Sequence, residues 1–157
     1  MHRTFLEYFC ACEFVKRFGK RGLEGGLTIE ELKTEVFGKH WQDDSWHEVL
    51  RLITGMIDTS FAGQIIDYLM ALDGESQKFM NLFLATECFS DVRNRSLIAV
   101  TDAQLLNHLK YLIGYRYDQN LKIAKQAVSV IANVWKDDPD TLPLLKIHVL
   151  SDDDGRV

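Results

Sequence analysis

Apolar residues recur every three or four positions along almost the whole chain, and this spacing constrains the fold more than any other feature. Val49, Leu50, Ile53, Met56 and Ile57 show the pattern clearly. Such spacing places apolar side chains on one face of a helix. Only two prolines interrupt a chain of 157 residues. The sequence therefore predicts an all-α fold of six to eight helices, joined by short links as stacked antiparallel αα-hairpins.

Local signals place several helix starts. Thr28 with Glu31 and Ser45 with Glu48 each have the spacing of a capping box. In that motif the two side chains bond to backbone N–H groups in the first turn. Thr101 is predicted to cap a later helix, and the short apolar run just before it is expected to lead into this cap instead of forming a strand.

Residues 76–92 depart from a one-sided pattern. Apolar side chains occupy more than one face of the helix that their spacing predicts, namely Phe79, Leu82 and Phe83 on one face and Met80, Leu84 and Cys88 on another. A helix of this kind is usually covered by protein from two sides. The segment is therefore expected to lie inside the fold.

The charge balance narrows the range of partners. The formal net charge is −5, which disfavours nucleic acid or an anionic membrane as the main partner. Residues 137–157 carry six acids and two bases, and this acidic excess is typical of a solvated surface with helix caps. No apolar run reaches the roughly 20 residues that a membrane span needs, and the first residues do not have the pattern of a signal peptide. The chain is expected to be cytoplasmic.

No pattern in the sequence predicts catalysis. The chain lacks the GxxxxGK[ST] and GxGxxG phosphate-binding patterns, and none of its five histidines lies three or four positions from another. Cys10, Cys12 and Cys88 are expected to be buried, reduced thiols, and no serine or cysteine has the context of a nucleophile elbow. The sequence thus predicts a non-enzymatic protein without metal or cofactor, and an uncharacterised small-molecule enzyme remains as an alternative.

The three tryptophans differ in their sequence context. Trp46 and Trp135 fall on apolar helix stripes and are expected to pack in the core. Trp41 lies in a predicted loop beside His40. It is therefore expected to be open, as part of a possible interaction surface.

The two ends of the chain are expected to expose apolar surface. Phe5, Tyr8 and Phe9 are spaced to share one face of the first helix, and they are expected to be buried against the following helices, with Arg3 and Glu7 more exposed. Both ends interrupt patterns that need a neighbour. An open apolar face is therefore expected beside the first helix or beside three residues of the last apolar run, Leu144, Leu145 and Val149. A second copy could cover this face and give a homodimer through the helical ends.

The first helix opens with the sequence HRTFLEYFCA, which consists of His2, Arg3, Thr4, Phe5, Leu6, Glu7, Tyr8, Phe9, Cys10 and Ala11. This motif resembles one that follows the winged-helix region in bacterial NACHT-family NTPases, which are STAND-class signalling ATPases. Residues 28–41 and 46–52 are similar to the helical part of cyanobacterial members. Residues 138–146 and 151–157 resemble a HEAT-repeat hairpin that breaks off after its turn.

The resemblance implies one HEAT-like superhelical domain over residues 1–157. Its parts would be a helical connector at 1–38, stacked helical hairpins at 39–136, and the truncated start of a HEAT-like repeat at 137–157. Because the Walker motifs and the winged helix are absent, no ATPase residue carries over. What the resemblance implies is a coupling segment between a nucleotide-driven switch and a repeat sensor, with protein as its partner. The alternative is a free-standing α-helical adaptor that binds a protein.

Overall fold

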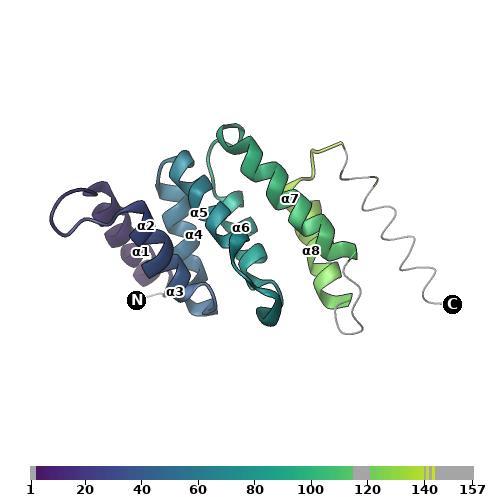
Figure 1. Cartoon of the computed structure of the whole chain (residues 1–157), viewed down its shortest axis with the longest axis horizontal. Helices are drawn as coiled ribbons and strands as arrows, with labels where there is room; N and C mark the ends of the chain where they lie inside the picture. The colour runs from purple at the N-terminus through teal and green to yellow at the C-terminus, as the bar shows by residue number, and fades with distance from the viewer. Residues whose placement is uncertain (1–2, 115–120, 140, 142, 144–157) are drawn as a thin grey trace. The chain divides into compact units, whose positions relative to one another are not determined.

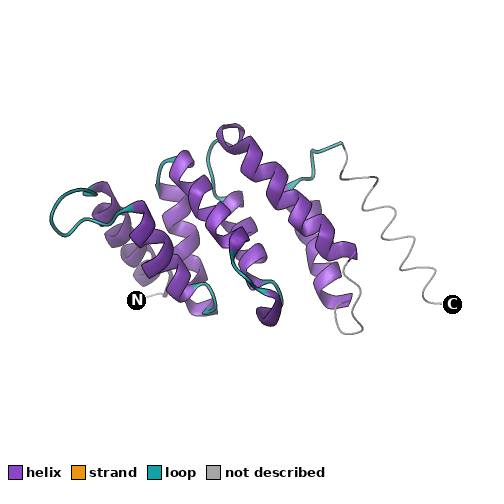
Figure 2. Ribbon diagram, viewed as in Figure 1, coloured by secondary structure: helices purple, strands orange, loops and turns teal. Residues whose placement is uncertain are grey.

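The computed structural model describes residues 3–114, 121–139, 141 and 143. In this part of the chain all regular structure is helical, with seven helices and no strand (Figures 1 and 2). The predicted all-α fold and the predicted number of helices are confirmed. The chain divides into two compact units, Met1–Leu105 and Leu106–Val157, and the division falls inside one long helix.

The first unit contains most of the helices. Its elements in chain order are α1 (Arg3–Gly19), α2 (Ile29–Glu31), η1 (Leu32–Phe37), α3 (Gly38–His40), η2 (Asp44–Trp46), α4 (His47–Met56), α5 (Thr59–Ala71), η3 (Glu75–Gln77), α6 (Met80–Ser90), η4 (Arg95–Ile98) and the start of α7 (Ala99–Gly114). The second unit contains the rest of α7 and α8 (Leu121–Val134). Because η1 is a π-helical stretch that joins α2 to α3 directly, these three elements form one helix with a widened middle.

Helix α6 forms the centre of the first unit. It packs against both α4 and α5, and eight of its eleven residues are buried: Asn81, Leu82, Phe83, Leu84, Ala85, Thr86, Cys88 and Phe89. The prediction of a helix covered from two sides is confirmed. The helix starts later than the sequence pattern indicates, because the residues before it form the separate turn η3.

One of the two predicted capping boxes is present. The backbone N–H of Glu31 donates to Thr28 Oγ1 at 3.1 Å, and the N–H of Thr28 donates to Glu31 Oε2 at 3.0 Å. The box predicted at Ser45 is wrong, because Asp43 caps this region instead. Its Oδ1 accepts from both the N–H and the hydroxyl of Ser45, at 2.9 and 2.6 Å. These two hydrogen bonds hold the pKa of Asp43 below its usual value.

Thr101 is not a helix cap, so that prediction is also wrong. The apolar run before it forms η4, which continues into α7 at Ala99 and places Thr101 inside the first turns of the helix. Its buried hydroxyl donates to Asp67 Oδ1 of α5 at 2.9 Å. Beside this bond, a Cβ atom at Gly63 would lie 2.6 Å from Ile98 Cγ2. The missing side chain at Gly63 therefore lets η4 pack directly on α5.

A buried amide connects the end of α5 to α6. Asn81 is 2% exposed, and its Nδ2 donates to the carbonyl oxygens of Leu69 and Leu72 at 2.8 and 2.9 Å. Leu69 lies in the last turn of α5 and Leu72 is its C-cap residue, where carbonyl oxygens lack the i+4 donors of the helix interior. A Cβ atom at Gly74 would lie 1.7 Å from Asn81 Oδ1, so the amide fits only against a glycine.

We expect Asn81→Asp to destabilise the fold strongly. The introduced carboxylate would face two carbonyl oxygens without a donor, and a buried group of this kind costs about 3–5 kcal/mol of unfolding free energy. Part of the loss should be recovered at acid pH, where the introduced carboxyl is protonated. Urea unfolding measures the change, with the exposed Asn107→Asp as the matched control. Equal effects of the two substitutions would contradict this role of Asn81.

Candidate functional site

Helix α1 is apolar on two opposite faces. Its inner face packs against α4 and buries Ala11 and Phe18, and the ring of Phe18 meets that of Phe61 from α5 edge-on, with centroids 5.0 Å apart. The opposite face is open to solvent. We define the α1 outer face as four exposed side chains: Phe5 (56% exposed), Leu6 (59%), Tyr8 (47%) and Phe9 (59%).

The α1 outer face is the densest exposed apolar surface in the described part of the chain. The described residues include nine exposed large hydrophobic side chains, and four of them lie within the five residues from Phe5 to Phe9. The other five are spread over four separate places along the chain, at Leu23, Leu97, Val100, Tyr111 and Leu121. Single exposed apolar residues are common on protein surfaces, whereas a contiguous patch usually marks a binding site.

The prediction that Phe5, Tyr8 and Phe9 are buried is wrong. Helical spacing shows which residues share a face, but it does not show which of two apolar faces meets the rest of the chain. The small side chain of Ala11 is 0% exposed and gives α4 close access to the other face. Glu7 is less exposed than these aromatic residues, again contrary to expectation. The prediction of an open apolar face beside the first helix is confirmed.

Two contacts within α1 arrange the aromatic side chains. The rings of Tyr8 and Phe9 meet edge-on, with centroids 5.9 Å apart. Tyr8 also forms a hydrogen bond with the half-buried Cys12, and this bond raises the pKa of the Tyr8 hydroxyl. The outer face therefore continues from Tyr8 towards Cys12 one turn further along the helix.

Four cations follow the α1 outer face at the C-terminal end of the helix and just beyond it. Arg21 lies over the rings of Phe18 and Phe61, at 4.6 and 4.8 Å from their centroids, and Arg17 Nε donates to a backbone carbonyl at 3.4 Å. Lys16 and Lys20 are exposed. Cations are favourable near a helix C-terminus, and here they stand about two turns beyond the apolar patch, with the exposed Glu13 between.

Trp41, which the sequence placed on an open surface, is buried, and that prediction is wrong. It is 5% exposed, and its carbonyl oxygen accepts a hydrogen bond from His47 Nε2 at 2.7 Å. Trp46 is only half-buried. It stacks on His40 with centroids 3.6 Å apart and an interplanar angle of 6°, and it contacts Phe14 of α1. The surface-accessible indole is therefore Trp46.

Some predicted site residues lie outside the described residues. These are His2, the side chain of Arg3, and the apolar residues Leu144, Leu145 and Val149. Among the others, Thr4 is exposed next to the outer face, and Trp135 is buried, as predicted. Leu6, Lys16 and Lys20 are exposed on α1 or just after it, and the sequence analysis did not predict them as site residues. The pattern that could have indicated them is an apolar stripe that ends in cations.

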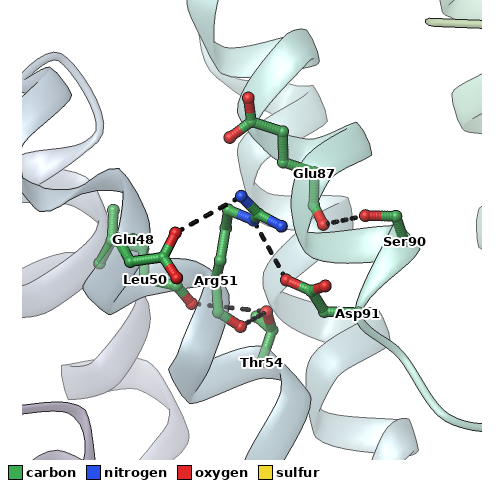
Figure 3. A network of polar contacts seen from close by, with 7 residues as sticks. All are labelled: Glu48, Leu50, Arg51, Thr54, Glu87, Ser90 and Asp91. Carbon is green, nitrogen blue, oxygen red and sulfur yellow. Dashed lines mark hydrogen bonds and ion pairs between the residues drawn. The ribbon is translucent and has the colours of Figure 1, made fainter. Parts of the chain in front are cut away.

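A polar network joins α4 to the end of α6 (Figure 3). Arg51 Nε donates to Asp91 Oδ2 at 3.1 Å, and Arg51 Nη1 donates to Glu48 Oε2 at 3.4 Å. Partial burial acts to lower the pKa of Arg51, but the bond to Asp91 and the carboxylates of Asp91, Glu48 and Glu87 outweigh it and raise the pKa. An arginine held in this way stabilises packing and is unsuited to proton transfer.

The three thiols have different environments. Cys88 is buried beside this network, and burial raises the pKa of its thiol to about 12. Cys10 and Cys12 are half-buried on α1, and burial also raises the pKa of Cys10. The prediction of three buried thiols therefore holds only for Cys88. A thiol with a raised pKa is a poor nucleophile at neutral pH.

The described residues contain no group of three or more His, Cys, Asp and Glu side chains that could hold a metal ion. Within the same residues, no helix has the length and apolar character needed to cross a membrane. No protein-family model, curated protein or solved structure matches the chain. The feature most typical of a functional site is thus the α1 outer face.

We expect Phe9→Ala to change the unfolding free energy by less than about 1 kcal/mol, because the side chain is already in solvent. Phe18→Ala removes a buried ring from the same helix and should cost about 3–5 kcal/mol. Urea unfolding of the two variants compares the two faces directly. A cost at Phe9 as large as that at Phe18 would show that the outer face is buried in solution.

Thiol labelling should separate the cysteines into two classes. Cys10 and Cys12 should react with an aromatic disulfide reagent in the native protein, whereas Cys88 should react only as fast as the chain unfolds. Because the pKa of Cys88 is raised from 9.0 to about 12, the unfolded thiol ionises while the folded one stays protonated. Folding stability should therefore fall as pH rises above 9, and Cys88→Ala should remove that part of the decrease. Rapid labelling of all three native thiols would contradict the expectation.

Proposed function

We propose that this chain is a non-catalytic helical interaction segment that binds protein through the α1 outer face. The observation that carries this proposal is the exposure of Phe5, Leu6, Tyr8 and Phe9 within two turns of one helix. Clustered aromatic residues are typical of the buried centre of a protein interface. The same helix is anchored to α4 by its inner face, so a bound partner would act on the packed core.

The finer proposal is that the chain couples the nucleotide switch of a NACHT-type NTPase to a repeat sensor. The motif that resembles this family, residues 2–11, includes all four side chains of the α1 outer face. In the family this motif follows the winged-helix region, so we propose that region as the partner that covers the face. HEAT-like stacking of the helices that follow would suit this role, because stacked helices move as rigid bodies. Cytoplasmic location belongs to the same proposal.

A chain with this role should bind neither ATP nor metal by itself. Calorimetric titration of the isolated chain with ATP and magnesium should show no binding in the micromolar range. Micromolar affinity would contradict the non-catalytic proposal.

The coding sequence and a pair of substitutions test the coupling role. If the reading frame encodes a P-loop and a winged helix before this segment, the longer protein should be made with Phe5→Ser and Phe9→Ser. Allosteric coupling is usually worth about 5- to 150-fold in nucleotide affinity, and we expect a change of this size. Leu23→Ser, which alters an exposed leucine outside the α1 outer face, is the control. A reading frame without a nucleotide-binding region would favour the free-standing adaptor.

A further inference from the structure

A strong concentration of positive charge lies where α1 ends. We define the basic cluster as Lys16, Arg17, Lys20 and Arg21, which lie in the last turn of α1 and in the turn that follows it. Residues 16–21 contain these four bases and no acid, so the rest of the chain has a formal net charge of −9 (−5 − 4). The end of a helix supplies only roughly half a negative charge. The helix end therefore compensates only a small part of the cluster.

The basic cluster is not neutralised by ion pairs either. Within the residues that the structure describes, none of its four side chains forms an ion pair with a carboxylate. Glu13 and Glu24 are exposed on either side of the cluster along the chain, and the exposed Asp58 precedes α5. These acids limit the extent of the positive surface. A complementary ligand is therefore negatively charged and short.

Two of the four cations are held by contacts within the fold. Arg21 lies over the rings of Phe18 and Phe61, and its Nη1 donates to the carbonyl oxygen of Phe18 at 3.0 Å. Arg17 Nε donates to the carbonyl oxygen of Gly25 at 3.4 Å. Because a guanidinium group has five N–H donors, each arginine keeps donors for a ligand. A cation that is positioned before binding also loses less conformational entropy when it binds.

The loop after α1 is tightly closed and presents the basic cluster to solvent. Its two ends are joined, since the N–H of Leu27 donates to the carbonyl oxygen of Arg17 at 2.9 Å. A Cβ atom at Gly26 would overlap the carbonyl oxygen of Lys20, so the two sides of the loop are in direct contact. Figure 1 shows this loop at an edge of the first unit. A ligand can therefore reach the cluster without a rearrangement of the helices.

We propose that the basic cluster binds a short acidic segment of a partner protein. Carboxylates of that segment pair with the two lysines and accept hydrogen bonds from the two arginines, and such bonds to a guanidinium group can be bidentate. The basic cluster shares no residue with the α1 outer face. It is thus a second docking site, and the inference goes beyond the proposed function without resting on it.

The charge of the whole chain favours a short segment over an extended polyanion. At physiological salt an exposed charge acts over about 8 Å. A peptide of a few residues can therefore meet the basic cluster alone. A membrane or a nucleic acid presents negative charge over a wider surface and would also meet acids of a chain that carries −9 outside the cluster. Their repulsion opposes binding of that kind.

Fluorescence anisotropy of the full chain with a labelled oligoglutamate peptide tests the site. Saturable binding is expected. It should weaken as salt rises from about 0.1 to 1 M, because the Debye length falls from about 10 to 3 Å. Lys16→Gln with Lys20→Gln should weaken binding about tenfold. The matched control, Lys122→Gln with Lys125→Gln, makes the same change in net charge at exposed positions of α8 and should leave binding nearly unchanged.

A second pair of variants separates a positioned guanidinium group from simple charge. Arg21→Lys keeps the charge but removes the planar fork, and it should weaken binding about threefold. Leu23→Ser alters the same loop without a change in charge and should bind as the original chain does. Urea unfolding verifies that each variant is folded.

Three results would overturn the inference. They are the absence of saturable peptide binding, equal effects of the lysine pairs in α1 and α8, and full binding by Arg21→Lys. Binding of phosphatidylserine vesicles or of single-stranded DNA without binding of the peptide would overturn it as well, in favour of an extended polyanion. None of these results decides the proposed function, because the α1 outer face is unchanged in every variant.

Discussion

The first unit depends on the burial of α6, whose apolar side chains surround the helix. Such a helix is stable only when protein covers it from more than one side, and α4 and α5 do so here. The positions of these two helices then determine the others, because α1 packs on α4 and η4 packs on α5. Two buried polar side chains of α6 donate hydrogen bonds to backbone carbonyl oxygens. Thr86 donates to the carbonyl oxygen of Leu82 at 2.8 Å, and Asn81 bonds to the end of α5.

The sequence predicts features that depend on local chemistry and fails where distant contacts decide. The Thr28 cap needs only residues three positions apart, and the burial of α6 follows from its own apolar faces. By contrast, Asp43 and Ser45 both suit a cap, and in the folded chain the Asp43 carboxylate accepts from both the N–H and the hydroxyl of Ser45. Thr101 has the sequence context of a helix cap, but in the folded chain its hydroxyl donates to Asp67 instead. Spacing alone does not reveal such long-range partners.

The candidate surface was predicted only in part, for the same reason. Periodicity indicated an aromatic stripe in the first helix, and the sequence also suggested an open face at that end of the chain. It did not reveal that the stripe and the open face are the same residues. That outcome is decided by Ala11 and Phe18, which face α4 and are almost fully buried.

The contact between Gly74 and Asn81 links two positions seven residues apart (81 − 74). No side chain fits at Gly74 while the amide keeps its place, and in that place the amide donates to the carbonyl oxygens of Leu69 and Leu72. During evolution neither residue can change first without loss of stability. A related chain with the same α5–α6 connection should therefore retain both residues or have replaced both together. This glycine–asparagine pair is a signature by which distant relatives could be recognised after the rest of the sequence has diverged.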